Sequence, residues 1–136
     1  MKNKTILLAD AAFLGGLGGI MMIQDFLGHF FQQGYFAEQF TNSPYTIGFF
    51  EASGLALLFA ISFVININSS NRRFWHGIAA VIHILLGGSN LLFWQNFFVT
   101  FGFVTQGIGA TVLHGVFILA NLYAFRKEHI SLSAKP

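Results

Sequence analysis

The sequence contains no cysteine, and only 9% of its 136 residues are charged. Without cysteine there are no disulfide bonds, thiol redox motifs or thiolate metal sites. A soluble domain carries about 25% charged residues, so this chain lacks the charge to cover a soluble surface in the usual way. More than half of it, 54%, is hydrophobic, and the mean hydropathy is +0.64. The length suits four membrane spans of about 20 residues each.

Lysine and arginine are missing from two connections between the apolar runs, residues 25–46 and 96–102. All seven basic residues lie at the opposite ends of the runs: Lys2, Lys4, Arg72, Arg73, Arg126, Lys127 and Lys135. Short loops that are rich in Lys and Arg stay cytoplasmic. The pattern therefore predicts a multi-pass protein of the inner membrane with both termini cytoplasmic. The predicted spans are residues 5–24, 44–64, 74–94 and 101–125.

These spans predict a single transmembrane domain, an all-α antiparallel four-helix bundle. Residues 26–42 are too polar to span and rich in aromatic rings, which favours a short helical segment at the membrane–water boundary between the first two helices. Ser43 followed by Pro44 is typical of a helix start. The basic, apolar N-terminus is similar to a signal peptide, but Asp10 interrupts it, so we interpret it as a retained helix.

The first span contains a G-x-x-x-G step, formed by Gly15 and Gly19. Such a step lets a neighbouring helix approach closely. The neighbour is either another helix of the same bundle or a helix of a second copy. A homodimer or a larger membrane complex is therefore an expected partner beside the lipid bilayer. No nucleic-acid partner is expected, because the sequence has no basic stripe with interleaved aromatic residues.

Polar residues follow one face of each predicted helix. Polar groups without a partner in hydrocarbon cost several kcal/mol each, so these faces are expected to meet inside the bundle. With a rise of about 1.5 Å per residue, the polar residues fall into layers at different depths. On the first helix the polar face holds Asp10, Leu14, Leu17, Met21 and Gln24, and on the second it holds Glu51, Leu55, Leu58 and Ser62. The outer layer holds Gln24, Glu51, Asn90 and Gln106, the middle layer His83 and His114, and the inner layer Asp10, His76 and Asn121, with Ser62 nearby.

The chemistry of these layers leaves alternatives open. Glu51 is the costliest residue, because a carboxyl group inside the bilayer must be protonated, hydrogen-bonded or hydrated. It marks a proton or substrate pathway, or it joins helices as a neutral acid. His83 and His114 are candidates for a b-type haem, a metal ion, a proton-carrying pair or two hydrogen-bonded neutral imidazoles. Asp10 and His76 are expected to share a buried hydrogen bond.

The stretch IGFFEASGLALLFAISF, residues 47–63, resembles the second helix of small four-helix bacterial membrane proteins of the DoxX-like group. Glu51, Gly54 and Leu55 hold the places of that group's acidic residue and Gly-Leu-rich run. The resemblance implies four spans, a longer first outer connection and a role in membrane redox or sulfur metabolism. It implies Glu51 as the site residue. The lack of cysteine argues against a thiol-based role.

The sequence has no serine-hydrolase, zinc-protease or phosphate-loop motif, so we expect no catalysis by this chain itself. The leading hypothesis is an accessory membrane protein that binds a small apolar ligand, such as a quinone or lipid, or another membrane subunit. One alternative is a redox subunit with a haem or quinone at His83 and His114. Another is a proton-coupled carrier of small molecules that uses Glu51. No cofactor follows firmly from these patterns.

Overall fold

The computed structural model describes residues 3–133, and this part of the chain is helical without β-strands. Its elements are α1 (Asn3–Phe31), α2 (Ala37–Phe40), α3 (Thr46–Asn66), α4 (Arg72–Leu92), the π-helix η1 (Gln95–Val99) and α5 (Val104–Ser133). As the hydropathy predicts, α1, α3, α4 and α5 are long and apolar enough to cross a membrane. A helix of 21 residues, such as α3, measures about 32 Å, which matches a hydrocarbon core of about 30 Å.

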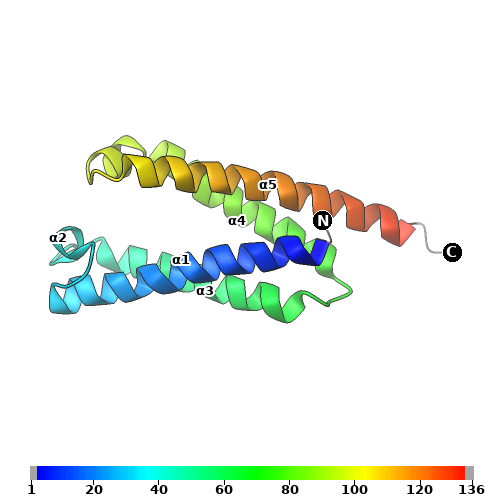
Figure 1. The fold of residues 1–136 in the computed structure, drawn as a ribbon, viewed down its shortest axis with the longest axis horizontal. Helices are drawn as coiled ribbons and strands as arrows, with labels where there is room; N and C mark the ends of the chain where they lie inside the picture. Colours follow the sequence, from blue (N-terminus) through cyan, green and yellow to red (C-terminus); the bar gives the residue numbers. More distant parts are fainter. Residues whose placement is uncertain (1–2, 134–136) are drawn as a thin grey trace. The chain divides into compact units, whose positions relative to one another are not determined.

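The chain divides into two compact units. The first unit, residues 8–65, contains α2, α3 and most of α1; the second contains the first turn of α1 with α4, η1 and α5. Each unit is built on one helix pair, α1 with α3 and α4 with α5, whose members run in opposite directions (Figure 1).

Two glycines of α1 bring it close to α3. A Cβ atom on Gly18 would lie 2.7 Å from the backbone oxygen of Ser53, and one on Gly15 would lie 3.0 Å from Cβ of Ala60. A Cβ atom on Gly19 would meet nothing within 4 Å. The close approach therefore uses Gly15 and Gly18. Gly19, the second member of the predicted step, takes no part in this contact with α3, and a role for it against a second copy stays a prediction.

The ends of two long helices differ from the prediction. α1 does not end at Gln24 but continues through Asp25 to Phe31, and α5 begins at Val104 and continues to Ser133. The expected boundary segment is therefore shorter, and its helical part is the four-residue α2. The turn after α1 uses left-handed backbone conformations at Gln32 (φ 55°) and Gly34 (φ 99°).

Ser43 marks the approach to α3, as predicted, but not as its cap. The Ser43 hydroxyl accepts a hydrogen bond from the backbone N–H of Tyr45 at 3.3 Å. A turn over residues 44–45 then leads into α3, which begins at Thr46.

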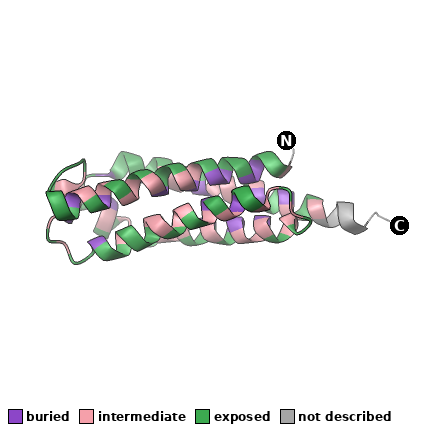
Figure 2. Ribbon diagram, turned by 90° about the horizontal axis from the view of Figure 1, so that it is seen from below, coloured by how far each residue is buried: buried purple, intermediate pink, exposed green. Residues whose placement is uncertain are grey.

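Exposed positions follow the whole length of the long helices, with buried positions between them (Figure 2). Many large apolar side chains are exposed, whereas several polar ones are buried. The fully buried side chains include polar ones, namely Asp10, Asp25, His76, His83 and Asn121. The most exposed apolar side chains include Leu92 at 81% and Leu119 at 71%. In water this distribution would be unfavourable, whereas hydrocarbon surroundings favour it.

Candidate ligand pocket and buried histidines

A pocket lies in the first unit where α1 ends and α3 begins. Its volume is about 500 Å³, within the range of about 300–1,000 Å³ that small-molecule sites occupy. Aromatic and aliphatic side chains form most of its wall, with a few polar groups among them. The lining residues are Asp25, Phe26, His29, Phe30, Ser43, Pro44, Thr46, Ile47 and Phe50.

Asp25 supplies the carboxyl group of this pocket and is completely buried, with 0% exposure. Its Oδ2 accepts a hydrogen bond from Ser53 Oγ at 3.3 Å, which is long for a bond between two oxygens. Its Oδ1 is buried and has no hydrogen-bond partner among the described residues. Leaving a buried carboxyl oxygen unpaired costs free energy. A ligand with a hydrogen-bond donor would recover that cost at this atom.

Aromatic rings form the wall beside Asp25. The rings of Phe26 and Phe30 lie 5.0 Å apart between centroids, and His29 meets the edge of Phe30 at 4.8 Å. Phe50 adds a ring from α3. Flat rings around one polar group are the usual construction of a site that holds an apolar body and orients it by a single head group.

Side-chain hydrogen bonds hold residues 32–45, the segment between α1 and α3 that contributes Ser43 and Pro44 to the pocket wall. Oε1 of Gln24 accepts the backbone N–H of Tyr35 at 2.8 Å. Thr46 Oγ1 donates to the backbone oxygen of Phe40 at 3.1 Å, and Thr46 is buried. These bonds tie the segment to the end of α1 and to the start of α3. Ser43 and Pro44 are therefore fixed at the rim.

The first unit contains no lysine and no arginine. Its acidic residues are Asp10, Asp25, Glu38 and Glu51, and its single histidine is His29. Asp25 therefore has no permanent positive charge within its own unit. An acid enclosed in this way is uncommon, because buried carboxylates are normally paired with a cation or fully hydrogen-bonded.

The second unit buries two histidines against each other. Nδ1 of His83 lies 2.9 Å from Nδ1 of His114, so one ring donates its proton and the other accepts it. His83 also stacks on Phe117, with ring centroids 4.8 Å apart and planes at 11°. Gly87 leaves room for this contact, because a Cβ atom there would lie 3.1 Å from Cβ of His114. The two histidines therefore join α4 to α5.

A second buried hydrogen bond lies nearer the start of α4. Nδ1 of His76 is 2.7 Å from Oδ1 of Asn121, so this ring nitrogen carries the proton and donates it. Beyond it, Arg72 and Glu128 form an ion pair at 2.7 Å, and Asn3 donates to the same Glu128 oxygen at 2.8 Å. The α4–α5 pair is thus held by polar contacts near the start of α4.

The histidine geometry does not fit a haem iron between the two rings. Imidazole nitrogens lie about 2.0 Å from a bound metal, so two on opposite sides are about 4 Å apart. The two Nδ1 atoms are closer than this, and the backbone at Gly87 packs directly on His114. No group of three His, Cys, Asp or Glu side chains within the described part of the chain could hold a metal ion.

The predicted outer layer needs correction. Glu51 and Gln106 are exposed, and Asn90 is half-buried. Leu55 and Leu58, which share a face of α3 with Glu51, are also exposed, at 55% and 60%. The carboxyl group enclosed at this end of the first unit is Asp25. By contrast, the middle and inner residues are buried, namely His83, His114, Asp10, His76 and Asn121.

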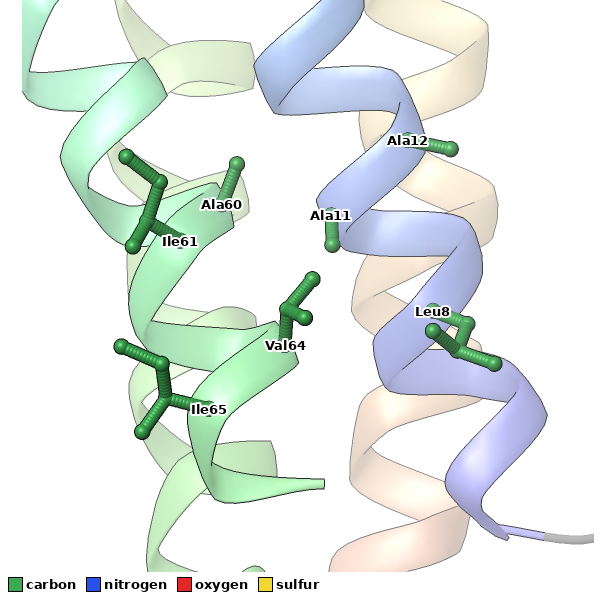
Figure 3. A pocket seen from close by; sticks show the side chains of 7 residues that line it. All are labelled: Leu8, Ala11, Ala12, Ala60, Ile61, Val64 and Ile65. Atoms are coloured by element: carbon green, nitrogen blue, oxygen red, sulfur yellow. The ribbon is translucent and has the colours of Figure 1, made fainter.

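A second cavity of the first unit, about 420 Å³, lies between α1 and α3 nearer the start of α1 (Figure 3). Its lining is entirely aliphatic: Leu8, Ala11, Ala12, Ala60, Ile61, Val64 and Ile65. Nothing in it would orient a ligand, so the Asp25 pocket is the better candidate site.

No family model matches the sequence, and no curated protein or solved structure matches it. The resemblance of residues 47–63 to the DoxX-like group therefore stays a prediction. The geometry of the pocket is therefore the evidence for a site.

Proposed function

We propose that this chain is a multi-pass membrane protein that binds a small, mostly apolar ligand in the Asp25 pocket. In this proposal it is an accessory or ligand-binding protein without catalysis of its own. The observation that carries it is Asp25, which lines a pocket of mostly aromatic and aliphatic side chains and whose buried Oδ1 lacks a partner among the described residues.

The membrane location is supported by the exposed apolar side chains of the long helices and by the positions of the basic residues. We propose an antiparallel four-helix bundle in the inner membrane with both termini cytoplasmic. The absence of cysteine makes a direct test simple. Ser70→Cys, between α3 and α4, should react with a membrane-impermeant maleimide only after the cells are lysed. Gln33→Cys, between α1 and α2, should react in intact spheroplasts, and the reverse result would contradict the orientation.

The ligand proposal can be tested by filling the pocket. Ile47 lines it, is 68% exposed and belongs to α3, so Ile47→Trp should block entry without disturbing the helix contact. Leu58→Trp is the matched control, because Leu58 lies on α3, is 60% exposed and lines neither cavity. We expect saturable binding of the neutral probes 4-phenylbutanol or ubiquinone-1 in nanodiscs, lost in the Ile47 variant only. If no probe of any charge binds saturably, the proposed function is wrong.

The other roles predicted from the sequence have less support. A haem at His83 and His114 is disfavoured by their direct contact, although a quinone beside them is not. A carrier that depends on Glu51 is disfavoured by the exposure of that side chain. Kinship with the DoxX-like group remains part of the proposal, on residues 47–63 alone.

A further inference from the structure

We infer that the ligand of the Asp25 pocket is a hydrophobic organic cation: a primary, secondary or tertiary ammonium group on an apolar body. This inference depends on the proposed function and names its ligand class. It follows from the combination of an enclosed carboxyl group, aromatic walls and the complete lack of lysine and arginine in the same unit.

The first step concerns the unpartnered oxygen. Asp25 is fully buried, and Ser53 satisfies only Oδ2, through a long hydrogen bond. Asp25 is one of the residues that line the cavity, and its buried Oδ1 needs a donor. An N–H of an ammonium group supplies a donor and a positive charge together, and such charge-assisted hydrogen bonds are about twice as strong as neutral ones.

The second step concerns competing cations. Residues 5–71 contain no lysine or arginine, so the pocket lies inside a long stretch of sequence without any basic side chain. The nearest titratable nitrogen on the pocket wall is that of His29, one helical turn from Asp25 and exposed. Glu38 and Glu51 add further negative charge to the same unit. The unit therefore attracts cations. Because no lysine or arginine of the unit can neutralise Asp25, a cationic ligand can do so.

The third step concerns the shape and position of the pocket. Phe26, Phe30 and Phe50 line the pocket, and aromatic rings attract organic cations at their faces and also cover an apolar body. Asp25 lies 22 positions after Asn3 in α1, about 33 Å along the helix. In the proposed orientation this is the outer edge of a hydrocarbon core of about 30 Å. A ligand there can keep its head group near water and its body in the membrane.

The test compares three probes that share one apolar body: 4-phenylbutylamine, 4-phenylbutanol and 4-phenylbutyrate. Binding is measured by calorimetry to the full chain in phosphatidylcholine nanodiscs, with empty nanodiscs as the reference for partitioning. We expect the amine to bind at least about tenfold more tightly than the alcohol, since a hydrogen bond to a charged group contributes about 1.5–3 kcal/mol. The carboxylate should not bind.

Two carboxyl variants of the same unit separate the site from bulk charge. Asp25→Asn, which keeps the shape of the side chain, should remove the preference for the amine, and Asp25→Glu should retain part of it. Glu51→Gln, at an exposed carboxyl group that does not line the pocket, should leave it unchanged. The comparison of amine with alcohol on the unaltered chain needs no variant, so a folding defect cannot hide the result.

The outcomes distinguish the two proposals. Equal binding of amine and alcohol, blocked by Ile47→Trp, would overturn the cation inference and leave the proposed function standing. A preference for the amine that survives Asp25→Asn in a folded protein would also overturn the inference, because the charge would then be recognised elsewhere. Saturable binding of none of the probes would overturn both.

Discussion

The contact between α1 and α3 predicts opposite effects of one substitution at two neighbouring glycines. In Gly18→Ala, the new Cβ atom would lie 2.7 Å from the backbone oxygen of Ser53, 3.1 Å from Cβ of Ala56 and 3.1 Å from the backbone nitrogen of Leu57. Two of these neighbours are backbone atoms, which cannot rotate away as a side chain would. The helices must therefore separate locally. In Gly19→Ala, the new methyl group meets nothing within 4 Å.

The magnitudes follow from two opposing terms. Overpacking a tight contact costs about 1–3 kcal/mol, and replacing a helical glycine by alanine recovers about 0.5–1 kcal/mol. We therefore expect Gly18→Ala to lower the free energy of unfolding by roughly 0.5–2 kcal/mol. Gly19→Ala should leave it unchanged or raise it by up to about 1 kcal/mol. Gly15→Ala should fall between them, because its nearest neighbour would be Cβ of Ala60 at 3.0 Å.

The free energies can be measured by unfolding the purified protein with SDS in mixed micelles and scoring the intact fraction after a brief protease pulse. Circular dichroism before the titration checks that each variant starts with the same helix content. If Gly18→Ala proved as stable as Gly19→Ala, the two helices would not approach each other as closely as the structure has them, and the position of Ser53 beside Asp25 would lose its basis.

Two further predictions concern the α4–α5 pair and use the same unfolding assay. Asn121→Leu removes the acceptor of the buried His76 proton and should lower the free energy of unfolding by about 0.6–2 kcal/mol. Adding His76→Phe should restore part of the loss. If Asn121→Leu alone leaves the free energy of unfolding unchanged, this hydrogen bond contributes nothing. Glu128→Gln breaks the ion pair with Arg72. The side chain of Arg72 is 22% exposed and that of Glu128 is 12% exposed. The substitution should cost up to about 1 kcal/mol at low salt and less at high salt, and a salt-independent loss would contradict an electrostatic origin.

Most of the helical fold was predictable, because runs of about 20 apolar residues have few other solutions. The helix ends were less so. The predicted first span ends at Gln24, and residues 26–42 after it are too polar to span. In the structure Ser53 and the surrounding side chains enclose the carboxyl group of Asp25, so the helix continues to Phe31. Tertiary contact decided a boundary that local composition could not.

The burial of His76, His83, His114 and Asn121 was predictable from the sequence. The expected partner of His76 was Asp10, whereas the structure pairs its Nδ1 with Asn121. The spacing of His76 and His83 on α4 matches that of His114 and Asn121 on α5, and two antiparallel helices that turn these faces together must pair them. The chemistry of the histidine pair was not predictable, because it depends on a distance. Gly87 allows the two rings to touch, and that contact favours a shared hydrogen bond over a haem between them.

Asp25 was missed because a sequence predicts the depth of a residue in the membrane more readily than the side of the helix that faces its neighbour. The polar face predicted for the first helix includes Met21 and Gln24. The face that packs against α3 is a different one, and its residues follow at steps of three, four and three: Gly15, Gly18, Met22 and Asp25. The two faces differ by one residue at their outer ends, which is about 100° around the helix. The glycines were the usable signal, because they mark the side on which another helix comes close.

Glu51, which was expected to face the bundle interior, is exposed in the structure. The predicted face of Glu51 on the second helix continues through Leu55 and Leu58 to Ser62. The Ser62 hydroxyl donates to the backbone oxygen of Leu58 in its own helix, at 2.9 Å, as serine in membrane helices can do. A serine in a membrane helix is therefore a poor sign that its face of the helix is buried in the bundle. An ionised carboxyl group is a better sign, because its own turn of helix offers no N–H or O–H to satisfy it. Of two acids at the same end of one helix pair, the one beside the close-packed glycine face is the one that the fold encloses.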